Sequence, residues 1–284
     1  MTVLLHISDP HFGTERAPVV EALVALARQQ RPDLVVLSGD ITQRARRQQF
    51  GLARAFVGRL GAPVLAVPGN HDIPLFNLAA RLGWPYGGYL RAFGGQAPAG
   101  QASAGLTWGD AVEPVFSSPD LLVIGVNTTR WYRHADGAVS GRQIQRVAQR
   151  LALATPGQLR LVVVHQPVAV QHAEDEHDRL HGHAAALARW AAAGADLVLG
   201  GHIHLPYVMA LAGLARPIWV VQAGTAVSQR VRAGVPNSVN LLRWAQGAPA
   251  GHCLIEQWDG AADGADFVCR QTTDVQPAAL GDGR

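Results

Sequence analysis

Val64-Leu65-Ala66-Val67-Pro68-Gly69-Asn70-His71-Asp72 is the stretch that decides the fold. Its first four residues are apolar, which is typical of a short strand buried on both faces. An amide, an imidazole and a carboxylate follow where that strand ends. The apolar runs at 3–7 and 34–37 lead in the same way into Asp9 and Asp40. Polar groups at the ends of neighbouring buried strands indicate an α/β protein with a site in one cleft.

Helical patterns separate these first three strands. Residues 18–28 and 44–60 each place their apolar side chains on one stripe. The resulting β-α-β-α-β order implies parallel strands with right-handed crossovers. Strands are predicted again at 121–126, 159–164 and 197–199, with helices at 141–153 and 182–193. From residue 207 on we expect strands alone, at 207–212, 217–223, 238–244, 252–258 and 266–273. Two packed sheets with helices outside follow, in a single domain over 1–274.

Residues 73–112 interrupt this rhythm. The segment is rich in Pro, Gly and aromatic residues, as in Trp84-Pro85-Tyr86-Gly87-Gly88-Tyr89. Because it directly follows a strand that carries polar residues, we expect an insertion that forms a cap or pocket wall. A surface insertion without function is the alternative. The Pro-, Gly- and Ala-rich residues 275–284 predict a flexible tail.

Composition limits the class of protein and its surroundings. Apolar residues make up 48% and charged residues 16% of 284 residues, which indicates a globular domain with a sizeable core. The formal charge of +3 is too small to predict a nucleic-acid partner. Neither a secretory signal nor an apolar run of membrane-spanning length is evident. With two cysteines and no disulfide framework, a cytoplasmic location is expected.

Five segments hold candidate metal ligands: Asp9-Pro10-His11, Gly39-Asp40, Gly69-Asn70-His71-Asp72, His165 and Gly200-Gly201-His202-Ile203-His204. In a strand, residues two apart point to one side, so Asp9 and His11, like His202 and His204, are expected to aim at one point. A carboxylate such as Asp40 can bridge two cations. Carboxylate, imidazole and amide ligands suit Mn, Fe, Zn or Mg rather than a thiolate site. Each segment alone has an ordinary structural explanation, but their ordered combination at strand ends favours a two-metal site.

The ordered series Asp-x-His, Gly-Asp, Gly-Asn-His-Asp, His and Gly-His-x-His resembles the calcineurin-like metallophosphoesterase superfamily. The motifs run from Asp9 to His204. The resemblance implies a four-layer αββα sandwich of two mixed sheets with flanking helices. It also implies two metal ions, the first held by Asp9, His11, Asp40 and His204, and the second by Asp40, Asn70, His165 and His202. Mn or Fe/Mn are the ions it favours, with Zn or Mg as alternatives.

Differences from the motifs of two well-known branches narrow the range of subfamilies that this chain resembles. Purple acid phosphatases carry Tyr where this chain has Gln43, and protein Ser/Thr phosphatases carry Glu where it has Asp72. The stretch 67–74 is similar to bacterial class III cyclic-nucleotide phosphodiesterase-like proteins. Pro10 stands where Leu is usual and is expected to face away from the ligands.

The resemblance also implies a reaction. A hydroxide that bridges the two metals would attack the phosphorus of a phosphate ester in line with the leaving oxygen. His71 would lie beside the metals and protonate the leaving group or stabilise its charge. Asp72 or a neighbouring group would hold His71, so His71 and Asp72 are the candidate catalytic residues.

Four further residues are candidates for substrate contact. Arg44 falls at a phosphate-contacting position of the protein phosphatase motif, and Asn127 follows a buried strand. His181 and His183 belong to a histidine-rich loop over 171–183, for which a third metal site is the alternative. The segment 224–232 follows a strand in the same way, and we assign it no role beyond substrate contact.

Phosphodiesterase activity, with cyclic nucleotides as a candidate substrate, is the function that the sequence favours. A phosphomonoesterase, or a pyrophosphatase acting on nucleotide-sugar or lipid-linked diphosphates, is the alternative among enzymes. A non-catalytic scaffold would not need seven candidate ligands together with His71. A nuclease is discounted because this sequence shows no sign of a basic groove. The expected partner is a small phosphate ester, and the apolar insertion suits a bulky substrate group or a homodimer interface equally well.

Overall fold

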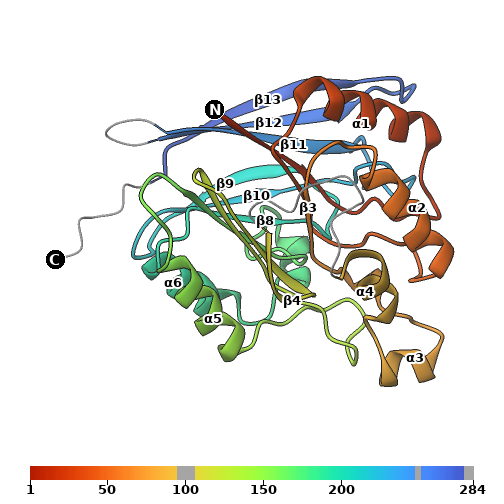
Figure 1. Cartoon of the computed structure of the whole chain (residues 1–284), viewed down its shortest axis with the longest axis horizontal. Helices are drawn as coiled ribbons and strands as arrows, with labels where there is room; N and C mark the ends of the chain where they lie inside the picture. Colours follow the sequence, from red (N-terminus) through yellow and green to blue (C-terminus); the bar gives the residue numbers. More distant parts are fainter. Residues whose placement is uncertain (95–105, 247–250, 278–284) are drawn as a thin grey trace.

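The computed structural model describes residues 1–94, 106–246 and 251–277 (Figure 1). Helices cover much of the outside of two sheets. They are α1 (Ala17–Gln30), α2 (Arg47–Val57), α3 (Leu78–Gly83), α4 (Gly87–Phe93), α5 (Gly141–Leu151) and α6 (His183–Ala192), with 3₁₀ turns η1 (Asn70–Asp72) and η2 (Ala173–Asp178). The helices expected at 18–28, 44–60, 141–153 and 182–193 are therefore present, with ends shifted by at most three residues.

Both sheets are mixed. The first has the order β13-β12-β11-β1-β2-β3 and is built from β1 (Thr2–Ile7), β2 (Leu34–Leu37), β3 (Val64–Ala66), β11 (Ser238–Ala245), β12 (His252–Gly260) and β13 (Phe267–Val275). The second has the order β4-β5-β6-β7-β8-β10-β9 and is built from β4 (Leu106–Asp110), β5 (Glu113–Ser117), β6 (Leu121–Gly125), β7 (Leu159–Val163), β8 (Leu197–Gly200), β9 (Tyr207–Leu211) and β10 (Ile218–Gln222). The strands β1, β2 and β3 are mutually parallel, as are β6, β7, β8 and β10.

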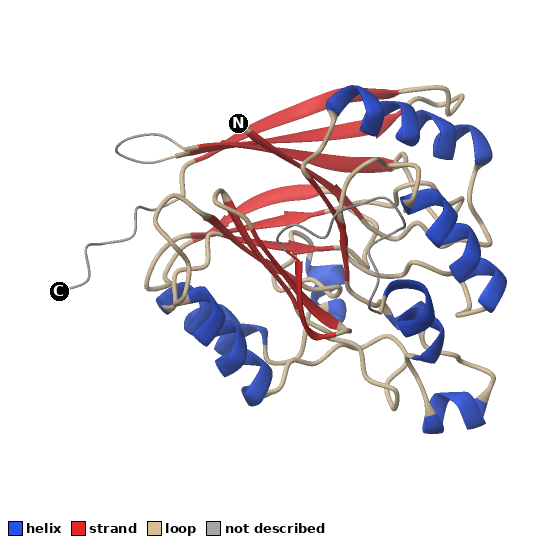
Figure 2. Ribbon diagram, viewed as in Figure 1, coloured by secondary structure: helices blue, strands red, loops and turns tan. Residues whose placement is uncertain are grey.

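Three apolar layers hold the sheets and helices together. Because successive strand residues face opposite sides, Leu5 packs with helix α1 while Leu4 packs between the sheets. In the second sheet Val162 packs with Trp190 of α6, whereas Leu161 and Val163 join the layer between the sheets. The three cores thus lie between four layers, and Figure 2 shows the sheets inside with helices outside. The predicted four-layer αββα sandwich is confirmed.

The insertion is more structured than the sequence indicated. It contains α3, α4 and β4, while residues 95–105 lie outside the described part of the chain. Tyr89 of α4 is 1% exposed, packs in the core with α2, and donates a hydrogen bond to the Ala66 carbonyl at 2.7 Å. Helix α4 therefore belongs to the domain core, whereas Leu78 and Leu82 of α3 are each 65% exposed.

Strand β5 was not predicted, because Glu113 and Pro114 obscure its apolar pattern. Glu113 is 4% exposed, accepts a hydrogen bond from Gln143 at 2.6 Å and pairs with Arg146. At the other end of the chain, β13 continues through the buried Val275, two residues beyond the strand expected there. The predicted tail falls mainly on 278–284, outside the described residues. Across the described ranges, none of the helices combines the length and apolarity needed to cross a membrane.

Candidate metal centre

The candidate ligands lie on loops that follow the parallel strands β1, β2, β3, β7 and β8. Backbone hydrogen bonds continue from the strands into these loops, since Asp9 N donates to Gly39 O at 3.1 Å and His11 N donates to Asp40 O at 3.0 Å. In the second sheet Gly201 N donates to His165 O at 2.9 Å. The loops are thus fixed to one another by their backbones before any side chain is considered.

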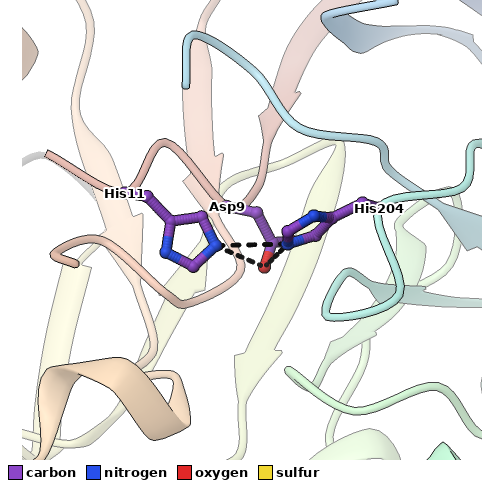
Figure 3. A group of neighbouring side chains, drawn as sticks. All are labelled: Asp9, His11 and His204. Carbon is purple, nitrogen blue, oxygen red and sulfur yellow. Dashed lines mark hydrogen bonds and ion pairs between the residues drawn. The ribbon is translucent and has the colours of Figure 1, made fainter. Parts of the chain in front are cut away.

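A first group consists of Asp9, His11 and His204 (Figure 3). The Nε2 atoms of the two histidines are 3.1 Å apart and both face Asp9 Oδ1, which lies 3.8 Å from His11 and 3.4 Å from His204. Asp9 and His11 are fully buried. Two imidazole nitrogens and a carboxylate oxygen therefore point at one small volume, although 193 residues separate the two histidines.

A second group consists of Asp40, His165 and His202. His165 Nε2 lies 3.3 Å from Asp40 Oδ1 and 3.1 Å from Asn70 Oδ1, so the amide joins this group. Asp40 also faces the first group, since its Oδ2 lies 3.8 Å from His11 Nε2. One carboxylate thus lies between two clusters of nitrogen and oxygen atoms.

We expected strand alternation to bring these side chains together, and this explanation was wrong. Asp9, His11, His202 and His204 lie beyond the ends of their strands, so strand alternation does not align them. Instead all four have positive φ angles, of 50°, 42°, 75° and 56°, and Asp40 has φ 46°. Among the described non-glycine residues only Arg31 and Ala45 share this conformation. Left-handed backbone costs about 1–3 kcal/mol per residue, so the site concentrates strain that the surrounding fold must hold.

Glycines allow the ligand loops to approach. A Cβ on Gly69 would lie 2.0 Å from Asp40 N, and one on Gly201 would lie 2.4 Å from Asp9 Oδ2. A Cβ on Gly39 would lie 2.4 Å from His165 Nδ1. Any larger residue at these positions would displace a ligand, which is the physical reason for the glycines that precede or neighbour the ligands in the sequence.

Burial and mutual pairing set the charges of the site. Burial raises the pKa of Asp9, but pairing with His204 and the charge of His165 lower it well below its usual range. Burial alone would lower the pKa of His165, yet the charge and hydrogen bond of Asp40 raise it to about 9. Burial lowers the pKa of His11 to about 3, so His11 is neutral with a free lone pair. The site keeps its carboxylates ionised.

Unsatisfied polar atoms show that these residues fit a metal. Asp9 Oδ1 and His202 Nδ1 are buried and have no hydrogen-bond partner among the described residues. Such orphaned acceptors cost free energy unless something else binds them. Ionised carboxylates, neutral imidazole and an amide oxygen are ligands for borderline or hard divalent ions. The donor set therefore suits a pair of such ions.

Asp72 does not hold the His71 ring. Its buried carboxylate accepts hydrogen bonds from the backbone nitrogens of Ile41, Thr42 and Gly69, at 3.0, 2.8 and 2.9 Å. It thereby fixes the loop of Asp40 to the loop of Asn70. Burial and the nearby Asp40 charge raise its pKa to about 6, against these hydrogen bonds.

The backbone carbonyl of Gln43 holds His71 instead, because His71 Nδ1 lies 2.9 Å from it. The opposite ring atom, Nε2, lies 4.0 Å from Asp40 Oδ2 and 3.2 Å from Arg230 Nη1. The His71 side chain is 21% exposed, in contrast to the fully buried His11 and His165. His71 therefore presents one nitrogen at the open side of the clusters.

The four residues predicted to contact substrate have other described partners. Arg44 places its guanidinium 5.3 Å from the centre of the Phe76 ring. Asn127 Oδ1 accepts hydrogen bonds from the nitrogen and hydroxyl of Thr129. His181 lies 3.9 Å from Asp136, and His183 donates to the Leu180 carbonyl at the start of α6. These contacts do not connect the four residues to the metal clusters.

Three residues near the site were missed. Arg230 contacts both His71 and Gln43, and the only sequence signal was its segment following β10. The ring of His134 lies 6.3 Å from that of His71. Asp178 Oδ1, from the histidine-rich loop, lies 3.5 Å from His202 Nε2. That loop reaches the centre through a carboxylate, not through the histidines that singled it out.

The sequence model of calcineurin-like phosphoesterases matches residues 2–206, which include every residue of the two clusters. The chain belongs to the calcineurin-like phosphoesterase family. Members of this family use divalent metals, in agreement with the donor set described above.

Curated relatives of this chain carry phosphodiesterase names. A glycerophosphodiester phosphodiesterase of Enterobacter lignolyticus is 40% identical over 83 residues, which are 25% of this chain and 29% of the relative. A probable cyclic nucleotide phosphodiesterase of Synechococcus is 28% identical over 160 residues, 56% of this chain and 52% of the relative. The matched stretches thus span about half or less of these relatives' lengths.

Solved structures support the fold. A dimetal phosphatase from Danio rerio superposes with a TM-score of 0.65 at 14% identity, over 98% of this chain and 99% of that one. A purple acid phosphatase from yellow lupin has a TM-score of 0.66 at 11% identity, over 97% of this chain and 53% of that one. At such identities the likeness shows the architecture alone.

The close approach of Gly69 to Asp40 predicts opposite effects for two Gly→Ala variants. Gly69→Ala should lower the free energy of unfolding by about 1–3 kcal/mol, because the methyl group overlaps the Asp40 backbone. Gly51→Ala, where a Cβ meets nothing within 4 Å on helix α2, should raise it by about 0.5–1 kcal/mol. Urea denaturation of both variants measures this, and equal effects would contradict the packing argument.

Proposed function

We propose that this chain is a dinuclear-metal-dependent phosphodiesterase. The observation that carries the proposal is the place of Asp40, with Oδ2 3.8 Å from His11 and Oδ1 3.3 Å from His165. A carboxylate that faces ligand clusters on both sides can bridge two cations. The names of the two curated relatives favour diesters over monoesters as substrates.

Each ion would have four protein ligands. Asp9, His11, Asp40 and His204 would hold the first, and Asp40, Asn70, His165 and His202 would hold the second. This mixture of oxygen and imidazole ligands suits Mn or a mixed Fe/Mn pair, with Zn or Mg as alternatives. When bound, such a pair supplies positive charge to the phosphate ester and lowers the pKa of water toward neutrality.

His71 and Arg230 would serve the phosphate and the leaving group. Since the Gln43 carbonyl binds Nδ1 of His71, the catalytic nitrogen is Nε2, on the open side. From there His71 would donate a proton to the leaving oxygen. Arg230, whose guanidinium lies 3.2 Å from Nε2, would exchange this contact for a phosphate oxygen when substrate enters.

A metal-dependence assay tests the proposal. The purified protein, stripped with a chelator and resupplied with Mn, should hydrolyse bis(4-nitrophenyl) phosphate faster than 4-nitrophenyl phosphate. A panel of cyclic nucleotides, glycerophosphodiesters and lipid-linked diphosphates would then rank substrates. Asp40→Asn, which keeps the side-chain size, is the matched control and should be inactive. Activity that survives in the stripped protein or in Asp40→Asn would refute the bridging role.

His71→Asn should lower kcat by about 10²–10⁴-fold while both metals stay bound, because general acid catalysis contributes by that order. The loss should be larger for an alkyl diester from the panel than for a nitrophenyl ester, whose leaving group needs less protonation. Metal content by elemental analysis is the control. An equal loss on both substrates would assign His71 to phosphate binding instead.

Asp178→Asn should weaken metal binding by about 10–100-fold, as expected for a carboxylate that orients a ligating histidine. The physical reason is its Oδ1, 3.5 Å from His202 Nε2. Competition with a fluorescent chelator measures the affinity without reference to activity. The neighbouring Asp175→Asn provides the comparison, because Asp175 pairs with Arg232 and not with His202. Unchanged affinity in Asp178→Asn would exclude the positioning role.

A further inference from the structure

A cavity of about 620 Å³ lies between the start of α2 and the helices α3 and α4. We call it the arginine cavity, after four of the residues that line it: Arg44, Arg46, Arg47 and Arg91. Phe76 and Trp84 contribute aromatic walls. The cavity shares no residue with the two metal clusters, so the metal centre does not account for it.

The positive charge of the arginine cavity is not balanced by acidic residues in its described lining. Arginine is ionised at any physiological pH, and no Asp or Glu is among the described residues that line the cavity. Ion pairs within the described ranges engage other arginines, such as Arg59, Arg160 and Arg232, and none of these four. Four like charges around one concave surface create a positive potential that attracts an anion.

The aromatic walls indicate that the anion carries an apolar or planar part. Phe76 and Trp84 are 73% and 62% exposed, an unusual exposure for such large side chains. The Arg44 guanidinium lies 5.3 Å from the Phe76 ring centre, and that of Arg91 lies 5.9 Å from Trp84. Guanidinium groups held beside aromatic rings suit a ligand that combines a ring with a phosphate.

The lining of the cavity begins one residue after Gln43, whose carbonyl holds the His71 ring. Arg44 follows Gln43, whose carbonyl holds His71, and Pro74 follows Ile73 at the end of the Asn70–Asp72 turn. Consecutive Cα atoms are about 3.8 Å apart, so the lining of the cavity begins directly beside two of the loops that carry candidate ligands. This adjacency makes the cavity a candidate to receive the part of a substrate that extends from the metal centre.

We infer that the arginine cavity is the subsite for the part of the substrate distal to the scissile phosphate, and that this part carries a second anionic group beside a planar ring. The inference rests on the proposed phosphodiesterase function and narrows its substrate class to nucleotide-like diesters with an additional phosphate. The ring would stack on Phe76 or Trp84, and the additional phosphate would bind the guanidinium groups.

Two substrates that differ by one phosphate test the inference. They are the 4-nitrophenyl ester of thymidine 5′-phosphate, with and without a 3′-phosphate. The wild-type protein should hydrolyse the 3′-phosphorylated ester with kcat/KM higher by roughly tenfold or more, since each charge-assisted contact contributes about that factor. The double variant Arg46→Gln/Arg91→Gln should abolish the preference, so that the two esters have the same kcat/KM.

The control is Arg28→Gln/Arg142→Gln, which removes the same charge from exposed positions on α1 and α5 and should keep the preference. No preference in the wild type, or an equal preference in the cavity variant, would overturn the inference. If neither ester is hydrolysed, the phosphodiesterase proposal fails. Calorimetry with thymidine 3′,5′-bisphosphate then decides on the cavity alone: binding that the cavity variant loses supports an anion site, and absence of binding overturns it.

A second copy of the chain is the rival occupant, because Leu78 and Leu82 extend the exposed apolar surface beyond the cavity. Sedimentation of the wild type and of Phe76→Ser distinguishes the two. A monomer in both cases agrees with a ligand site. A dimer that Phe76→Ser dissociates would show that a partner covers the cavity, and would overturn the inference.

Discussion

The approach of the Asp40 loop to the Gly69 loop is the constraint on which the candidate metal centre depends. The two backbones lie so close that a single Cβ on Gly69 would fall 2.0 Å from Asp40 N. Asp72 closes this contact by accepting hydrogen bonds from both loops. With the loops fixed, Asp40 Oδ1 accepts a hydrogen bond from His71 N at 2.8 Å, and the carboxylate is aimed between the clusters before any ion binds.

Holding five ligands in left-handed backbone conformation is costly, and the four-layer architecture is what makes it sustainable. The strands that precede these residues are buried on both faces, so their ends cannot relax without exposing the core. Loop-to-loop hydrogen bonds such as His11 N to Asp40 O then transmit that rigidity to the ligands. The site is preorganised by its supports, which is the arrangement expected of a centre that must keep two like-charged carboxylates apart.

Sequence reasoning located the seven candidate ligands because an apolar run of four or five residues followed by a polar one is a local signal. It misjudged how those ligands converge, because left-handed φ angles at Asp9 or His204 arise from loop-to-loop contacts across the fold and leave no local pattern. Arg230 and Asp178 were missed for the same reason: both reach the site through contacts with residues more than 20 positions away. Asp72 looked catalytic because it adjoins His71, yet its carboxylate accepts hydrogen bonds from the backbone of the Asp40 loop and of its own loop.

The residues proposed to carry out the reaction and the residues proposed to select the substrate lie in different parts of the site. The ligand motifs lie within the part of the chain that the family model matches, and solved phosphatases of low sequence identity share the fold. The residues that follow the motifs belong to a different feature of the molecule. Arg44 and Pro74 line the arginine cavity, together with further arginine and aromatic side chains. Solvated charges contribute little to stability, so folding alone does not explain why these arginines gather around one cavity. The proposed determinants of substrate choice therefore begin one residue beyond the motifs, in a cavity that contains none of the residues of the two metal clusters.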